Sequence, residues 1–73
     1  MARIEIKSEI TGTVWEVKAQ PGDKVDSGDI LLIIESMKME IPVITEDAGM
    51  VAEILVGKKD AVAEGQVVAV LDG

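Results

Sequence analysis

The sequence predicts an all-β fold in which about eight short strands form two related sheets around one core. The first observation is a repeat: a shift of 37 positions gives eight identities in 36 ungapped pairs, including Gly12 with Gly49 and Gly28 with Gly65. The second is that apolar residues alternate with polar ones or form short runs bounded by turn residues. The third is that no segment sustains the 3.6-residue apolar period of a helix, so we expect little or no helix.

The first half of the chain begins with an alternating segment and ends with a continuous apolar run. Its strands are predicted at Arg3–Lys7, Thr13–Val17 and Ile30–Ile34. The loop Ala19–Asp29 has turn residues at each end and Val25 near its middle. We expect Val25 to pin this loop to the core, and Gly28 to supply a positive φ at the entry to the next strand.

The second half repeats this order. Its strands are predicted at Ile41–Thr45, Met50–Val56 and Val67–Leu71. Val62 occupies the position of Val25 in the loop Gly57–Gln66, and Gly65 that of Gly28. Pro42 has no N–H for a β-ladder, which predicts an edge strand or an outward-facing amide. Neither half can bury its apolar face alone, so we expect a single domain over residues 1–73, with the repeats at 1–36 and 38–73.

Composition excludes several classes of function. The 73 residues contain no cysteine and no histidine, which argues against hydrolytic and metal-dependent catalysis. The net charge of -7 argues against nucleic-acid binding, which needs clustered cations, and favours a monomer. Residues 1–10 contain no long apolar segment, so we expect neither a signal peptide nor a membrane span, and we predict a cytoplasmic protein.

The segment that joins the two halves has unusual turn chemistry. In Ile33–Ile41, two apolar runs approach each other as the arms of a hairpin, but Ser-Met-Lys-Met stands where Asn-Gly or Asp-Gly is usual. Under the 37-residue shift Lys38 corresponds to Met1. If a twofold axis relates the halves, Lys38 lies at the opposite end of the molecule from the chain ends. Breaks with local sequence rules often mark functional sites, which makes Lys38 the candidate residue.

The neighbours of Lys38 allow more than one interpretation. Met37 and Met39 are either flexible fillers at the end of the core or a soft apolar recognition surface beside the amine. Glu35 and Glu40 can form ion pairs with Lys38, and exposed pairs of this kind contribute only ~0–1 kcal/mol. We interpret Trp15, the sole aromatic residue, as a partly buried part of the core.

The residues around Lys38 resemble a known motif. Glu35-Ser36-Met37-Lys38-Met39 is similar to the Glu-Ala-Met-Lys-Met attachment motif of biotinyl domains, with Ser in place of Ala. Gly12, the segment Pro21-Gly22-Asp23-Lys24-Val25 and the pair Gly28-Asp29 extend the resemblance over nearly the whole chain. The resemblance implies a flattened β-barrel or sandwich of two four-stranded sheets with quasi-twofold symmetry. The run Val14–Val25 leaves no room for the thumb insertion of some biotinyl domains, and no linker precedes the chain, so we expect a stand-alone thumbless acceptor or an excised domain.

The resemblance implies a carrier rather than an enzyme. A biotin protein ligase would join biotin to Lys38 as an amide, with Glu35, Ser36, Met37 and Met39 as recognition residues. A biotin carboxylase and a carboxyltransferase would then be partners of the tethered cofactor, which visits both active sites at high effective concentration. The amide would take the net charge from -7 to -8.

Two other functions stay open. Lipoyl domains usually have Asp-Lys-Ala around the modified lysine, so the two methionines favour biotin. Lipoate at Lys38, attached by a lipoyl ligase, remains an alternative, as does acceptance of both cofactors. An unmodified structural module, like the lipoyl-like domains of membrane fusion proteins, is the second alternative, although such modules lack the attachment lysine.

Overall fold

The computed structural model describes residues 3–73, which form eight β-strands and no helix. The strands are β1 Arg3–Lys7, β2 Gly12–Val17, β3 Lys24–Val25, β4 Ile30–Ser36, β5 Met39–Ile44, β6 Gly49–Ile54, β7 Ala61–Val62 and β8 Val67–Asp72. The six predicted strands are all present, and the two loop valines lie in the short strands β3 and β7. Within the described chain, no helix could cross a membrane.

The main difference from the sequence prediction concerns the ends of strands. β4 continues to Ser36 and β5 begins at Met39, because the ladder extends through the pairs Glu35–Glu40 and Ser36–Met39. β6 ends at Ile54, before the predicted end at Val56. The hairpin between β4 and β5 is therefore longer, and its turn shorter, than the apolar runs alone indicate.

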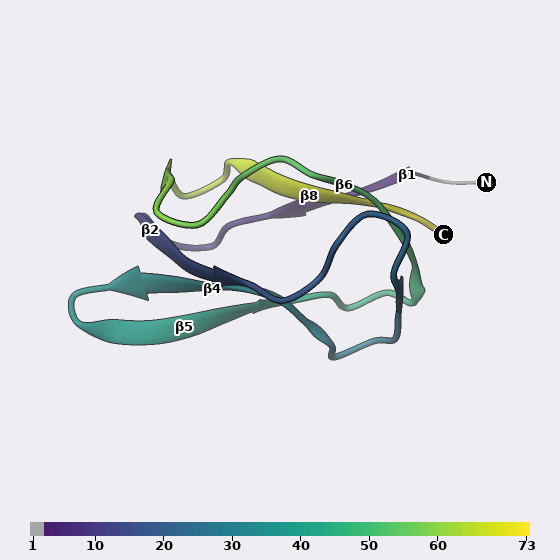
Figure 1. Ribbon diagram of the computed structural model, residues 1–73, viewed down its shortest axis with the longest axis horizontal. Coiled ribbons are helices and arrows are strands. Elements are labelled where there is room, and N and C mark those ends of the chain that lie inside the picture. Colours follow the sequence, from purple (N-terminus) through teal and green to yellow (C-terminus); the bar gives the residue numbers. More distant parts are fainter. Residues whose placement is uncertain (1–2) are drawn as a thin grey trace.

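The strands form two antiparallel four-stranded sheets with the orders β1-β8-β6-β3 and β5-β4-β2-β7. The 37-residue shift converts one order into the other, strand for strand. Each sheet also carries a β-bulge at matching positions, at Trp15 in β2 and Ala52 in β6. The predicted all-β fold with quasi-twofold symmetry is confirmed, and Figure 1 shows the two layers lying face to face.

The core lies between the two sheets. Its largest fully buried apolar side chains come mainly from the two central strands β4 and β8: Leu31, Leu32, Ile34, Val68 and Leu71, joined by Val14 and Val51 from β2 and β6. Val25 and Val62 are buried as predicted, at 8% and 3% exposure, and pin their loops to this core. β5 is an edge strand, which confirms the expectation for Pro42.

The turns that close each half are also duplicated. Gly28 and Gly65 have φ of 93° and 86°, as predicted, and their N–H groups donate to the carbonyls of Thr45 and Ser8 at 2.7 and 2.8 Å. The buried hydroxyls of Ser8 and Thr45 donate in turn to backbone carbonyls two residues ahead, at 2.6 and 2.7 Å. These bonds satisfy the only polar side chains in the buried part of residues 3–73.

The molecule is elongated, with extents of 36 × 18 × 17 Å. Figure 1 shows the β4–β5 hairpin at one end of the longest axis, with the C-terminus and the start of β1 near the other end. Met1, the partner of Lys38 in the repeat, lies outside the described residues. The structure confirms the predicted separation of the hairpin from the C-terminal end of the chain.

Candidate functional site

The candidate lysine occupies a two-residue turn at the tip of the β4–β5 hairpin. Ser36 and Met39 form the last pair of the ladder, so only Met37 and Lys38 connect the strands. Their φ angles are 51° and 65°, the pattern of a type I′ turn, which normally recruits Asn and Gly. Holding two L-residues in this region costs roughly 1–2 kcal/mol per residue. The sequence thus keeps Met-Lys in a turn whose backbone conformation would be less strained with Asn-Gly.

All five motif residues gather at this hairpin, and the tip is open to solvent. Met37 and Met39 are 92% and 63% exposed, and Lys38 is exposed between them. The alternative in which the methionines fill the end of the core is therefore wrong. Together they form a soft apolar surface on either side of the amine.

The acidic residues near Lys38, Glu35 and Glu40, form no ion pair with it. Among residues 3–73, the only ion pairs are Arg3–Glu53 and Lys18–Glu16. Glu35 and Glu40 instead lie directly opposite each other across the ladder, an arrangement that brings like charges together. The hairpin therefore presents two carboxylates that no cation of the described chain balances.

The hairpin is held to the segment around Gly12 up to the residue pair next to its turn. The hydroxyl of Ser36 donates to the carbonyl of Thr11 at 3.0 Å, which ties β4 to the segment entering β2. Gly12 lies so close to β4 that a Cβ there would meet the Glu35 carbonyl oxygen and the Ile34 Cγ2, the latter at 2.8 Å. Only glycine fits this approach, so β2 supports β4 nearly as far as the turn.

The sequence interpretation of Trp15 is wrong. Its side chain is 45% exposed, because Trp15 is the extra, unpaired residue of the β2 bulge, next to Glu16, which pairs with Ile33. Ile30 and Ile44 form an exposed cross-strand pair in the same sheet. One signal was available in the sequence: β5 is apolar at Ile41 and Val43 and also at Pro42 and Ile44, so both of its faces are apolar.

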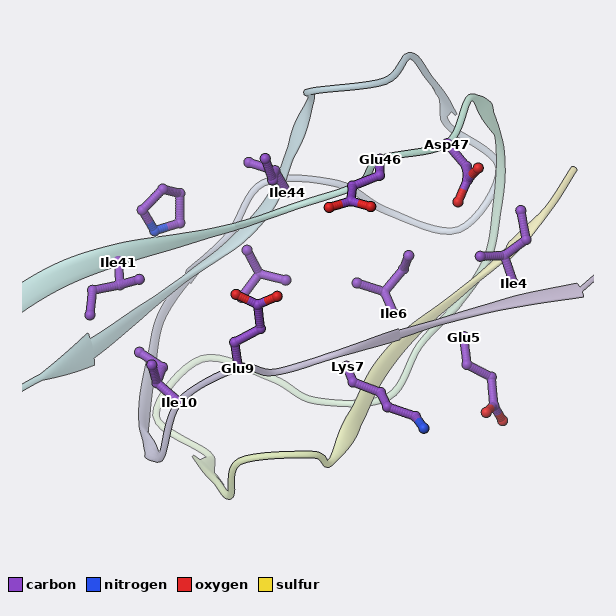
Figure 2. Close-up of a pocket in the computed structure, with 12 residues that line it drawn as sticks. Ile4, Glu5, Ile6, Lys7, Glu9, Ile10, Ile41, Ile44, Glu46 and Asp47 are labelled. Atoms are coloured by element: carbon purple, nitrogen blue, oxygen red, sulfur yellow. The ribbon is translucent and has the colours of Figure 1, made fainter.

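A groove with a volume of about 510 Å³ lies elsewhere, between the edge strands β1 and β5. Its lining consists of six pairs related by the repeat: Ile4, Glu5, Ile6, Lys7, Glu9 and Ile10 with Ile41, Pro42, Val43, Ile44, Glu46 and Asp47. Figure 2 shows Glu9 and Glu46 entering it from opposite sides, above apolar side chains. The groove follows from the quasi-twofold symmetry and contains no residue of the motif.

Comparisons with known proteins agree with this geometry. A family model described as "Biotin-requiring enzyme" matches residues 3–71. A "Biotinylated protein TB7.3 homolog" of Mycobacterium leprae is 40% identical over 92% of this chain and 94% of its own length. A "Biotin/lipoyl attachment protein" of Bacillus subtilis is 37% identical over 85% of each chain.

The fold has a close structural match. The urea carboxylase of Kluyveromyces lactis contains a region that superimposes with a TM-score of 0.93 and 39% identity, covering 99% of this chain and 6% of the carboxylase. The superimposed region of the carboxylase and this structure share the same fold. The chain belongs to the biotin/lipoyl attachment family.

Proposed function

We propose that this protein is a biotin carrier whose cofactor is attached to Lys38. The observation that supports the proposal best is the position of Lys38, exposed at the tip of a two-residue turn between two exposed methionines. A modifying enzyme can enclose such a tip without contact from the rest of the fold. We also propose that residues 1–73 act as one attachment domain.

In the proposed reaction, a biotin protein ligase uses ATP to activate the carboxyl group of biotin, releasing pyrophosphate. Nζ of Lys38 attacks the activated carbonyl, an amide bond forms, and AMP and a proton leave. Met37 and Met39 pack against the ligase, while Glu35 and Ser36 fix the hairpin and its charge. Bound biotin supplies a carrier for carboxyl groups, and this chain supplies the mobile tether and catalyses no step itself.

The partners of the loaded carrier are a biotin carboxylase and a carboxyltransferase. The likeness to a region of a urea carboxylase supports this part of the proposal. The proposed setting is the cytoplasm, and a chain without cysteine is compatible with that reducing compartment.

Lipoate at Lys38 is the second candidate function. It is favoured by the relative named "Biotin/lipoyl attachment protein", and a lipoyl ligase would then be the modifying enzyme. An unmodified structural module is a third possibility, and an exposed Lys38 in its motif argues against it.

Intact mass spectrometry tests the proposal. The protein is incubated with ATP and a biotin protein ligase plus biotin, or with ATP and a lipoyl ligase plus lipoate. We expect one biotin per chain. We also expect the fraction of chains that gain lipoate to be smaller than the fraction that gain biotin.

The matched variants are Lys38→Arg and Lys59→Arg, since both lysines are exposed and lie in turns. Lys38→Arg should gain no mass, whereas Lys59→Arg should behave as the wild type. A mass gain that persists in Lys38→Arg would show that the attachment site is elsewhere. No gain on the wild type with either ligase would favour the structural module.

A further inference from the structure

The two quasi-equivalent sheets have different outer faces. The hairpin sheet, β5-β4-β2-β7, presents Trp15, Ile30, Ile33, Pro42 and Ile44 on its outer side, a set that we call the apolar face. The repeat places Ala52, Val67, Val70, Glu5 and Lys7 at the same positions of the other sheet. Two of the five apolar positions are thus charged in the other sheet, and the tryptophan is an alanine.

An exposed ion pair spans the outer face of the other sheet. Arg3 on β1 and Glu53 on β6 lie on either side of β8 and are 3.2 Å apart, and Val70 on β8 between them is only 6% exposed. In the hairpin sheet the repeat replaces Arg3 and Glu53 with Glu40 and Glu16.

Two carboxylates cannot form the bridge, and Glu16 pairs with Lys18 at 3.0 Å instead. Ile33, the counterpart of Val70, is more exposed to solvent than Val70. The outer face of the hairpin sheet therefore lacks an ion pair across its strands, whereas the outer face of the other sheet carries one beside Val70 and still exposes Met50.

The apolar face of the hairpin sheet is continuous with the β4–β5 hairpin that carries Lys38. Ile33 and Pro42 pair on the strands β4 and β5, separated from the Ser36–Met39 end of the ladder by two further pairs. A specific protein interface covers about 800 Å² on each partner, and the whole molecule exposes 4659 Å². A two-residue turn is too small for that area, so an enzyme that binds specifically around Lys38 also contacts the surface beside it.

We propose that the apolar face is a docking surface for the biotin protein ligase that modifies Lys38, which rests on the proposed function. The ligase contributes an apolar surface over Trp15, Ile33 and Pro42, with basic side chains toward the unbalanced Glu35 and Glu40. This surface holds the carrier while the turn enters the active site. Contacts on this surface contribute the same binding free energy in the ground state and in the transition state of biotin transfer.

The test replaces residues of one sheet with the residues that the repeat has at the same positions of the other sheet. Pro42→Glu with Ile44→Lys gives the hairpin sheet the residues that Glu5 and Lys7 supply in the other sheet, on a backbone that already accepts them. The control is Met50→Thr with Leu55→Lys, at positions that are 46% and 51% exposed in and just after β6. It replaces these two apolar side chains with the residue types that the repeat has at Thr13 and Lys18. Initial rates of biotin transfer are measured against carrier concentration, with a bacterial biotin protein ligase, ATP and biotin.

We expect the KM for the carrier to rise about tenfold in Pro42→Glu/Ile44→Lys with kcat nearly unchanged, because lost uniform binding raises KM alone. The control should keep the wild-type KM. Trp15→Ala, which copies Ala52, is a second variant that should raise KM in the same direction. A urea midpoint for each variant separates loss of docking from loss of folding.

Wild-type KM in both Trp15→Ala and Pro42→Glu/Ile44→Lys would overturn the docking surface while leaving the proposed function intact. So would a wild-type dimer in sedimentation that these variants dissociate without changing KM, since the face would then bind a second copy. No biotin on the wild type would instead overturn the proposed function, and the docking proposal with it.

Discussion

Lys38 and Lys59 both lie in exposed turns with positive φ, at 65° and 77°, yet their surroundings differ. The N–H of Lys59 donates to the Val14 carbonyl at 2.8 Å, and the Asp60 carboxylate accepts the N–H of Gly57 at 2.7 Å, so this turn lies along β2. Within residues 3–73, Met37 and Lys38 have no hydrogen bond to a residue outside the hairpin, although Ser36 beside them donates to the Thr11 carbonyl. Exposure and an unusual backbone therefore do not distinguish a candidate attachment lysine, whereas separation from the rest of the fold does.

The repeat sharpens the same comparison. Gly22 stands in the first half where Lys59 stands in the second, so the Lys59 turn is an ordinary loop that also accepts glycine. Under the same shift Lys38 aligns with Met1, which lies outside the described residues, so the Lys59 turn alone serves as the comparison for the Lys38 turn. The duplicated parts of the molecule carry the fold, and the unduplicated connection carries the candidate site.

The largest expected effect comes from breaking the support of the hairpin. Gly12→Ala should lower the free energy of unfolding by about 2–3 kcal/mol, because its Cβ would meet the backbone of β4 at Glu35. Urea denaturation measures the loss. Gly49→Ala is the matched variant, with a contact to the Asp72 carbonyl at 2.5 Å.

Both glycine variants should be destabilised to a similar extent, but only Gly12→Ala displaces the strand that bears Lys38. Under conditions where both are folded, biotin transfer should be slower in Gly12→Ala alone. An unfolding free energy equal to that of the wild type in Gly12→Ala would contradict the close approach of β2 and β4.

A smaller effect of opposite sign is expected at the turn itself. Met37→Asn with Lys38→Gly should raise the free energy of unfolding by about 1–2 kcal/mol, since Asn and Gly accept positive φ. Lys59→Gly should raise it by less, about 0.5–1 kcal/mol, because only one residue is relieved. Thermal or urea unfolding compares the two, and a loss of stability in the double variant would contradict the type I′ turn.

The smallest effect is expected at Ser36. Ser36→Ala removes the hydrogen bond to the Thr11 carbonyl, which is exposed, so stability should fall by about 0.5–1 kcal/mol or less. The expected change in biotin transfer is a modest rise in KM, measured with the same ligase assay. A large loss of stability would mean that Ser36 holds more of the hairpin than this one bond.

Much of the fold was predictable because both halves of the chain have the same pattern of apolar segments and turn glycines. Alternation identified β1, the apolar runs identified β4 and β8, and Gly28 and Gly65 were recognised as positive-φ residues. The extent of the hairpin was not predictable from hydrophobicity. The cross-strand ladder continues through the polar pair Glu35–Glu40, where the apolar pattern has already ended.

The candidate site was predictable in part. The motif identified the hairpin residues, while the exposure of Met37 and Met39 was left open until the turn geometry was known. Trp15 was misassigned because a lone aromatic residue usually packs in the core, and the β-bulge that turns it outward has no local sequence signal. The role of Thr11 as acceptor for Ser36 depends on a contact across 25 residues, which no local pattern encodes.

The most direct test of the central proposal is to locate the cofactor on the chain. The wild-type protein is labelled with a biotin protein ligase, digested, and its peptides are sequenced by fragmentation mass spectrometry. The separation of the Lys38 turn from the rest of the fold predicts that all of the biotin is on Lys38 and none on Lys59. Biotin on Lys59, or spread over several lysines, would contradict it.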